Sequence, residues 1–375
     1  MKTPPNKHYH IAVVQWYPED DFANVVTDEL SRLGNSPVIF SPKEPVPEGV
    51  DLVFTYAPFG KFMPIVNHLA SLPPGTRPLL VHWNTEGLPD LRIPWQITRA
   101  VAAGRSRLER LIQPHGNGRF QPLAKISSLS KIDFSMQRFR FIGDYYAAYS
   151  QGILNVFSDS SAVYAGIHNE HGLPTVYAPW GSTPRWYSDL EMERDIDVLW
   201  MGKRGTRRRS HLLDRVRAEL KTHGIEIHVA DNVENPFIFG DERTEYLNRA
   251  KITLNITRTW YDDNFSRFSL AAPNRSLVVS EKMLPHCPSY QVGSHYIEAK
   301  PDDLARAVLY YLKNPAEREQ IVENAYRLTT EELTFNNSIK RIMAAVDEIA
   351  AKKIGLFTRN PAGNSMDKFT IREEQ

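Results

Sequence analysis

Residues 196–209 read Ile-Asp-Val-Leu-Trp-Met-Gly-Lys-Arg-Gly-Thr-Arg-Arg-Arg, and this stretch decides the fold. Its first six residues form the apolar run of a buried strand, and a helical pattern begins at Ser210. Between them lie two glycines and five cations. Glycine lets the backbone approach a ligand closely, and a helix N-terminus offers free N–H groups. The stretch therefore predicts a strand, a diphosphate-binding turn and a helix. A solvated basic loop is the alternative, because the pattern is neither the dinucleotide motif nor the P-loop.

The alternation of strand and helix extends to both sides of this stretch. Upstream, we expect strands at 11–16, 38–40, 50–56, 78–83, 155–157 and 175–178, and helices at 22–33, 62–72, 141–154 and 161–171. Downstream, we expect strands at 225–229, 252–256 and 276–280, and helices at 210–223, 244–250, 266–272, 301–312, 315–328 and 336–352. Such alternation favours parallel sheets covered by helices. The sequence therefore predicts an α/β protein of two Rossmann-like, doubly wound domains that face a central cleft.

The chain length supports this division into domains. Its 375 residues exceed the roughly 250–300 at which single cores stop growing. A Pro-Trp-Gly-Ser-Thr-Pro stretch at 179–184, followed by charged residues, marks the expected boundary. We predict an N-terminal domain at 1–182, a C-terminal domain at 183–335 and a helix at 336–354 that crosses back to the first domain. The polar tail at 355–375 is expected to be disordered.

Composition excludes several classes of protein. The 45 Lys and Arg side chains nearly balance 44 Asp and Glu, so the net charge of +1 gives no sign of a general nucleic-acid binder. The single cysteine, Cys287, excludes an internal disulfide and a thiolate zinc cluster. No stretch approaches the roughly 18 apolar residues of a membrane span. We therefore expect a cytoplasmic protein, and the oligomeric state stays open.

One segment, 92–140, departs from this charge balance. It holds ten Lys or Arg against Glu109 and Asp133, a local balance of +8. We interpret it as a basic insertion in the N-terminal domain, with a mobile loop at 114–130 rich in Gly, Pro and Ser. An anionic acceptor molecule or the surface of a membrane would suit this charge, which would make the protein membrane-peripheral. The segment contains no dedicated nucleic-acid-binding module.

A second polar loop follows the strand expected at 252–256. Residues 255–269 carry two arginines, Arg258 and Arg267, together with aspartates, asparagines and hydroxyls that include Asp263, Asn264 and Ser269. Such a density of hydrogen-bonding groups after a strand suits a ribose and phosphates. Surface charges with Asx and Ser caps are the alternative. Glu281, just past the next strand, would either accept from a sugar hydroxyl or lie at the N-terminus of the following element.

Transfer of a group from a bound diphosphate to a hydroxyl would need cations on the leaving group and, for direct displacement, a base on that acceptor hydroxyl. The candidates for stabilising the leaving group are Lys203, Arg204 and Arg267, and Arg258 is a further candidate. Glu86 follows the strand at 78–83 and is the candidate base, although a turn role explains it equally well. Asp144 is a weaker candidate, since it lies near an expected helix start where capping is a simpler explanation.

The order and spacing of motifs in the second half resemble a known family. The stretches are Tyr-Leu-Asn-Arg-Ala-Lys-Ile-Thr-Leu-Asn at 246–255, Ser-Arg-Phe-Ser at 266–269, Ser-Leu-Val-Val-Ser-Glu at 276–281 and Val-Gly-Ser-His-Tyr-Ile at 292–297, followed by Asp-Asp-Leu at 302–304, Tyr-Tyr-Leu at 310–312 and Ala-Glu-Arg-Glu at 316–319. Together they resemble the spore-maturation-type, CgeB-like glycosyltransferases over roughly residues 196–343. The first half matches only in general texture.

This resemblance implies a GT-B glycosyltransferase. Its C-terminal domain would hold a nucleotide-diphospho-sugar, with Gly202 among the donor-binding residues, and its N-terminal domain would hold the acceptor. Arg267 matches the arginine of the family's Arg-x-Phe-Glu helix, whereas Ser269 stands where that helix has a ribose-binding glutamate. Either the donor differs, Glu281 or Asp263 compensates, or the site has decayed.

The leading hypothesis is a metal-independent hexosyl- or related transferase that needs no cofactor besides the nucleotide-sugar co-substrate. A nucleotide-sugar epimerase of the same fold and a non-catalytic protein that binds a sugar nucleotide or a polymer are the alternatives. The sequence leaves open the base, the sugar, the acceptor and the stereochemistry.

Overall fold

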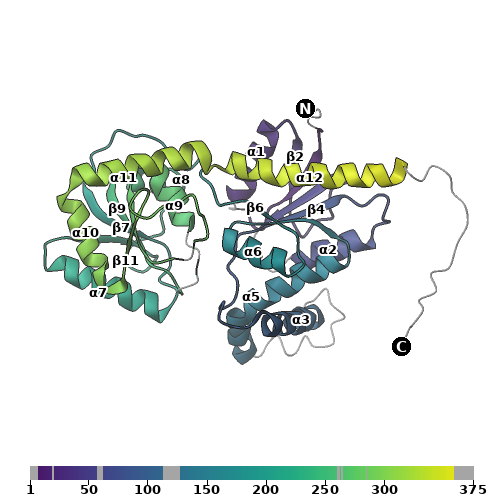
Figure 1. Ribbon diagram of the computed structural model, residues 1–375, viewed down its shortest axis with the longest axis horizontal. Helices are drawn as coiled ribbons and strands as arrows, with labels where there is room; N and C mark the ends of the chain where they lie inside the picture. The colour runs from purple at the N-terminus through teal and green to yellow at the C-terminus, as the bar shows by residue number, and fades with distance from the viewer. Residues whose placement is uncertain are drawn as a thin grey trace, which may run out of the picture.

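The computed structural model describes residues 7–18, 21–56, 62–112, 127–259, 262, 265–283 and 285–358. These residues form two lobes side by side, each built around one parallel sheet (Figure 1). Buried apolar side chains form one core cluster in the N-terminal lobe and two in the C-terminal lobe. The prediction of two Rossmann-like α/β domains is confirmed.

The N-terminal sheet has six strands in the order β2-β1-β3-β4-β5-β6. The strands are β1 (His10–Val14), β2 (Ser36–Phe40), β3 (Leu52–Tyr56), β4 (Leu79–Asn84), β5 (Leu154–Asp159) and β6 (Thr175–Tyr177). The helices of this lobe are α1 (Asp21–Arg32), α2 (Phe62–Ser71), α3 (Trp95–Ile112), α5 (Ser127–Ser150) and α6 (Ala162–Glu170). Every residue of β3 and β4 is buried, as expected of central parallel strands covered on both faces.

The C-terminal sheet has five strands in the order β11-β10-β9-β7-β8. The strands are β7 (Ile196–Met201), β8 (Ile227–Ala230), β9 (Ala250–Asn255), β10 (Leu277–Glu281) and β11 (Ile297–Ala299). The α-helices are α7 (Arg207–Lys221), α8 (Gly240–Arg249), α9 (Phe265–Ala271), α10 (Leu304–Lys313) and α11 (Pro315–Arg327), and short helices lie at Ala272–Asn274, Pro301–Asp303 and Leu328–Glu332. We did not expect the short strand β11.

The carboxyl ends of the two sheets face one another. Ser161, just after β5, contacts His286, just after β10: the serine Oγ lies 2.6 Å from the histidine Nδ1. The N–H of Ala162 donates to the carbonyl of His286 at 2.7 Å. Arg138 of α5 also pairs with Asp262 of the C-terminal lobe at 2.9 Å. The loops that follow the strands of both sheets therefore meet at the lobe interface.

The last helix, α12 (Phe335–Thr358), belongs to the core of the N-terminal lobe. Phe335, Ile339, Ile342 and Val346 are fully buried there, and Figure 1 shows the helix lying along that lobe. The chain returns past Gly181, where a Cβ would lie 2.3 Å from the backbone carbonyl carbon of Thr334. Only glycine fits at this crossing of two backbones.

Two expectations about flexible segments need correction. The helix expected at 141–154 begins at Ser127 and ends at Ser150, so the last four residues of the loop expected at 114–130 are helical. Helix α12 reaches Thr358, so the disordered tail cannot begin at residue 355. The remainder of both segments, 114–126 and 359–375, lies outside the described residues.

Three arginines of the basic segment 92–140 are engaged or buried within the protein, whereas Arg92 and Arg107 are exposed. Arg138 donates to the carbonyl of Leu88 and to Asp262, Arg99 lies 3.4 Å from the ring centre of Tyr146, and Arg140 is buried.

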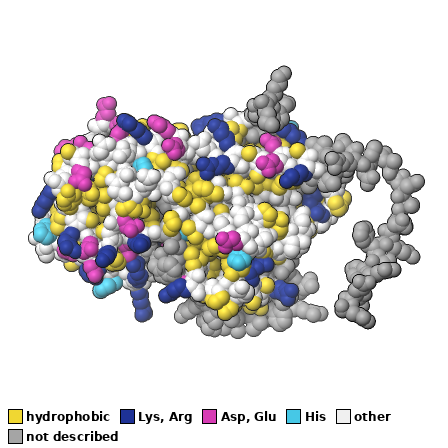
Figure 2. Space-filling view, in the orientation of Figure 1, with side chains coloured by type: hydrophobic (Ala, Val, Ile, Leu, Met, Phe, Trp, Pro, Cys, Tyr) yellow, Lys and Arg dark blue, Asp and Glu magenta, His cyan; other side chains and the backbone are white. Residues whose placement is uncertain are grey.

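On the face shown in Figure 2, positive and negative side chains are interspersed over the C-terminal lobe. None of the helices in the described part of the chain is long and apolar enough to cross a membrane.

Candidate functional site

The turn after β7 has the backbone geometry of a ligand-binding loop. Gly202 has a φ of +101° and Gly205 a φ of +74°, which is the left-handed region that favours glycine. Thr206 caps helix α7 by accepting from the N–H of Arg209 at 3.2 Å. The turn therefore leads from the carboxyl end of β7 directly into a helix N-terminus, as the sequence predicted.

A pocket of about 260 Å³ opens at this turn and extends across the carboxyl ends of β7 and β8. Its lining comes from the turn itself, from the loops after β8 and β9, and from helices α7, α8 and α9. The lining residues are Met201, Gly202, Lys203, Arg209, Ala230, Phe237, Ile238, Phe239, Arg243, Arg258, Ser266, Arg267 and Leu270. Five of these described residues are cationic and none of them is acidic, so the pocket suits an anion.

Arg267 forms one wall of the pocket from helix α9. Its Nε and Nη2 donate to the carbonyl of Met201 at 3.0 and 2.9 Å, and its Nη1 donates to Oδ1 of Asn255 at 2.9 Å. Its guanidinium lies 4.6 Å from the ring centre of Trp200. Burial, together with Arg209 and Arg258, lowers the pKa of Arg267 to about 9. The side chain is thus fixed by neutral partners, and no described carboxylate forms an ion pair with it.

Arg209 also lies near this tryptophan, with its guanidinium 5.7 Å from the ring centre of Trp200. Its Nη1 donates to the carbonyl of Lys203 at 3.1 Å, whereas its Nε and Nη2 are buried without a hydrogen-bond partner. Burial, followed by the nearby Arg258, lowers its pKa to about 10. An unsatisfied buried donor costs about 1–3 kcal/mol, and more for a charged group. Arg209 therefore presents unused donors at the place where an anion would bind.

The basic run at 203–209 contains Arg209, but we did not predict a role for this residue from the sequence. A signal was nevertheless present in the sequence. Arg209 lies four residues before Leu213 and seven before Val216, which is the spacing of the buried face of α7. That spacing turns Arg209 inward, whereas Arg207 and Arg208 are exposed.

Arg204 does not line the pocket, although it belongs to the same turn. Its Nε donates to Asp231 at 2.7 Å, and its two Nη atoms donate to Asp214 and Glu234 at 2.5 Å each. The guanidinium therefore forms ion pairs with three carboxylates. Through them Arg204 links the turn to α7 and to the loop after β8.

Glu281 and Ser269, the two residues weighed for the ribose, are both engaged elsewhere. The Glu281 carboxylate accepts from Arg208 through both of its oxygens and from the N–H of Thr257 at 2.9 Å. Ser269 donates to the carbonyl of Trp180 at 3.0 Å and is buried. Neither residue lines the pocket. Asp263 and Asn264 lie outside the described residues.

Glu86 lies at the lobe interface, in the loop between β4 and α3. Asn84 fixes its backbone by donating to the Glu86 carbonyl at 2.9 Å and accepting from the Glu86 N–H at 3.2 Å. Burial raises the pKa of the Glu86 carboxyl, whereas Arg138 and Arg258 lower it. Arg258, which lines the pocket, donates its backbone N–H to Asp262 at 3.3 Å, and Asp262 pairs with Arg138, which donates to the carbonyl of Leu88. These contacts place the loop of Glu86 across the interface from the pocket.

Asp144 has a different setting. It accepts from the hydroxyl of Ser106 at 2.5 Å, which links α5 to α3, and it is buried. One residue earlier, a Cβ at Gly143 would lie 2.1 Å from the carbonyl oxygen of Ala102. Asp144 is therefore part of the close packing between these two helices, and not a helix cap as the alternative interpretation held.

Comparison with solved structures identifies the arrangement of the two lobes. HepE of Anabaena, solved with UDP and glucose, aligns over 92% of this chain and 100% of its own, with 9% identity and a TM-score of 0.53. A glycosyltransferase of Rickettsia africae aligns over 92% and 99%, with 12% identity and a TM-score of 0.53. AviGT4, a glycosyltransferase of avilamycin A biosynthesis, aligns over 92% and 98%, with 14% identity and a TM-score of 0.51. The fold is GT-B.

The sequence comparisons bear on the C-terminal part of this GT-B chain. A family model described as glycosyl transferase-like matches residues 207–344. No curated protein matches the sequence. The matched region begins at α7 and contains ten of the thirteen lining residues, among them the four arginines Arg209, Arg243, Arg258 and Arg267. The family model and the fold together support a GT-B glycosyltransferase.

Proposed function

We propose that this protein is a glycosyltransferase of the CgeB-like type, which moves a hexosyl or related sugar from a nucleotide-diphospho-sugar to an acceptor in the cleft between the lobes. The observation that carries the proposal is the pocket in which Arg209 and Arg267 are buried, with no acidic residue and no carboxylate partner for either among the residues that the structure describes. The family model over 207–344 and the HepE structures, solved with UDP and glucose and with UDP-glucose, support it.

The cations of the pocket would act on the leaving group. In the transfer, the bond between the sugar C1 and the β-phosphate oxygen breaks, and negative charge accumulates on the nucleoside diphosphate. Arg209, Arg267 and Lys203 would stabilise this charge, with Arg258 at the side that faces Glu86. Because fixed side-chain cations can supply this stabilisation, we propose a metal-independent reaction that needs no further cofactor.

Glu86 would act on the acceptor. For an inverting path, its carboxylate would take the proton from the acceptor hydroxyl as that oxygen attacks the sugar C1. Burial favours this role, because a carboxylate with a raised pKa accepts a proton more readily. The N-terminal lobe would then hold the acceptor. The exposed Arg107 on α3, part of the basic segment 92–140, would favour an anionic acceptor or membrane surface.

The alternative of an epimerase has less support. Proton abstraction or elimination on the donor itself would require carboxylates around the sugar. None of the residues that line the described pocket is Asp or Glu. One observation favours the alternative of a non-catalytic protein that binds a sugar nucleotide: Ser269 and Glu281 form hydrogen bonds with other protein groups and not with the pocket. The Glu86 variant described in the Discussion separates this alternative from a transferase.

The donor site can be tested by replacing Arg209 with Met and Arg207 with Met. Arg209→Met removes buried donors that would bind the diphosphate, so we expect a dissociation constant about ten- to a hundred-fold higher for nucleoside diphosphates and for inorganic pyrophosphate, measured by calorimetry. Arg207 is exposed and outside the pocket, so its variant is the matched control and should bind as the wild type does.

The melting temperature without ligand separates loss of binding from loss of folding. Replacing an unpaired buried charge with an apolar side chain of similar length is often neutral or stabilising, so Arg209→Met should not melt earlier than the wild type. Equal affinity in wild type and Arg209→Met, or equal weakening in both variants, would contradict the assignment. If the wild-type protein binds none of UDP, GDP, ADP, dTDP and pyrophosphate, the assignment of a donor site is wrong.

A further inference from the structure

The pocket has two chemically different ends. At one end, Arg209 and Arg258 both lie against Gly205, and Arg267 lies against the neighbouring Gly202. The N–H of Arg258 donates to Asp262, which pairs with Arg138 of the N-terminal lobe, so this end faces the loop of Glu86. The transferred sugar must reach Glu86, so the diphosphate and the sugar belong at this end. The other end is lined by the loop after β8 and by helix α8, and it is left for the nucleoside.

Arg243 of α8 is the polar side chain at this second end. Its guanidinium lies 5.7 Å from the ring centre of Trp186, and its Nε is buried without a hydrogen-bond partner. No described acidic residue forms an ion pair with it, in contrast to Arg249 on the same helix, which pairs with Asp195 and Glu245. A partly buried arginine with an unused donor at a pocket wall is suited to a ligand that offers acceptors.

Two further lining residues, Phe237 and Phe239, precede Arg243 in the chain, and the backbone N–H of Arg243 donates to the carbonyl of Phe239 at 3.2 Å. Phe239 is 68% exposed, although it is a large apolar side chain, and it also ends the loop at the start of α8. Phe237 meets it edge-on, with ring centres 6.0 Å apart. An exposed aromatic face beside an unsatisfied arginine provides a stacking surface and an edge-reading donor for one planar heterocycle.

We propose that Phe239 and Arg243 form a base subsite that selects guanine, so that the donor is a guanosine-diphospho-sugar. Guanine presents two adjacent acceptors, O6 and N7, which a guanidinium contacts through two parallel N–H donors. Adenine presents an amino donor in place of O6, and uracil and thymine lack the paired acceptors. The proposal rests on the proposed function, because it assigns the nucleoside end of the same donor pocket.

The test is calorimetric titration of the full chain with GDP, UDP, ADP and dTDP, with inorganic pyrophosphate as a probe without a base. We expect GDP to bind about ten-fold tighter than the other three, which is the low end of the discrimination by a bidentate arginine. Arg243→Gln should abolish this preference and leave the affinity for pyrophosphate unchanged. Arg306→Gln, on the exposed side of α10, is the matched control and should change neither quantity.

A second variant keeps the test informative if Arg243→Gln folds poorly. Phe239→Ala changes a mostly exposed side chain, so it should fold, and it should weaken all four nucleotides about ten-fold without altering the preference for GDP. Equal affinities, a preference for UDP, ADP or dTDP, or a loss of pyrophosphate binding in Arg243→Gln would overturn the guanine subsite while leaving the donor site in place. Failure of every nucleotide and of pyrophosphate to bind would overturn the proposed function as well.

Discussion

Replacing Glu86 with Gln is expected to lower turnover by about two to four orders of magnitude, the range typical of a general base. The amide keeps the size of the side chain and the backbone hydrogen bonds to Asn84, but it cannot accept the proton of the acceptor hydroxyl. Affinity for the nucleoside diphosphate should stay within about two-fold of wild type, because Glu86 does not line the donor pocket. Turnover is measured as nucleotide release from a panel of donors, alone with water as acceptor and with an acceptor extract.

The matched control for this variant is Asp90→Asn. Asp90 lies in the same loop after β4, but its carboxylate is bound by Arg92 rather than facing the C-terminal lobe. Asp90→Asn should retain near wild-type turnover. If the turnover rate of Glu86→Gln lies within about three-fold of the wild-type rate, Glu86 is not the general base. Binding of donor without turnover in the wild-type protein would instead favour the non-catalytic alternative.

The free energy of unfolding is expected to fall as the pH falls from about 6.5 to about 4.5. Three histidines are fully buried, and burial lowers the pKa of His82 and His168 to about 3 and that of His286 to about 4. In the unfolded chain the pKa of histidine is near 6.5. Between these values the unfolded state binds protons that the folded state does not, so acid favours unfolding.

Carboxyl groups act in the opposite direction. Burial raises the pKa of Asp159 to about 7, so in this range the folded state holds a proton that the unfolded carboxyl has lost, and the raised pKa of Glu86 acts in the same direction. The three histidines outweigh this opposing effect, which leaves a net uptake of roughly one to two protons on unfolding, or about 1–3 kcal/mol per pH unit. Urea titrations at several pH values measure this slope.

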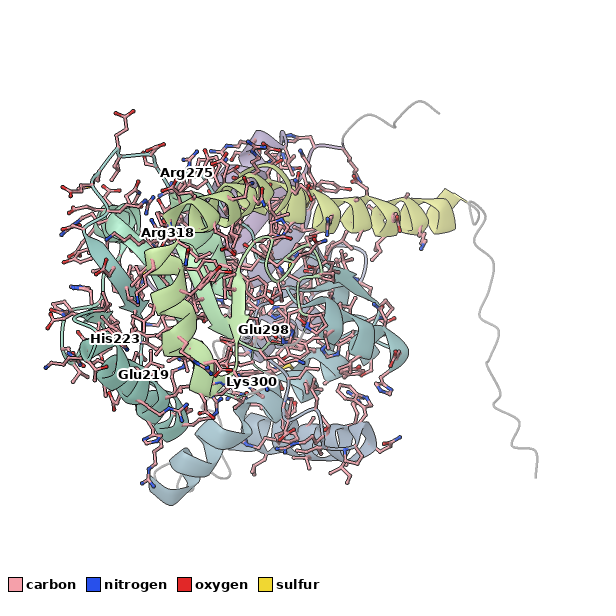
Figure 3. The ribbon with its side chains drawn as sticks, turned by 60° about the vertical axis from the view of Figure 1, so that its left-hand side comes forward. Glu219, His223, Arg275, Glu298, Lys300 and Arg318 are labelled. Carbon is pink, nitrogen blue, oxygen red and sulfur yellow. The ribbon has the colours of Figure 1, made fainter. Side chains whose placement is uncertain are left out.

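Two histidine variants show which groups set the slope. His286→Asn should reduce it by about one proton, or about 1.4 kcal/mol per pH unit. His223→Asn should leave it unchanged, because His223 lies beside Glu219 at the exposed C-terminal end of α7 (Figure 3). A free energy of unfolding that stays level or rises between pH 6.5 and pH 4.5 would contradict the assignment of neutral buried histidines.

The strands were the most predictable elements, for a physical reason. Strand β7 has the predicted bounds, because an apolar run between charged residues and a glycine has little freedom of register. Helix α5 begins fourteen residues before the predicted start, since Ser, Lys and Arg are interleaved with apolar residues over 127–140 and give no clear face. Strand β11 has only three residues and rests on its pairing with β10, which the local sequence does not encode.

The turn after β7 could be located from sequence, but the roles of its cations could not. Arg204 is bound by carboxylates from α7 and from the loop after β8, residues 10 to 30 positions away in the chain. Arg209 and Arg243 face the pocket because of helix phase and lobe packing. A run of charges shows where an anion could bind, whereas the fold decides which charges are already neutralised.

The return of α12 to the N-terminal lobe bears on how the protein is made. The first 177 residues contain all six strands of their sheet, yet the core around that sheet includes Phe335, Ile339, Ile342 and Val346. Chains fold during synthesis from the N-terminus, so the first domain must wait for the last helix to leave the ribosome. The second domain, made later, has core clusters of its own, so we expect it to complete its fold first. The expected order of folding is therefore the reverse of the order of translation.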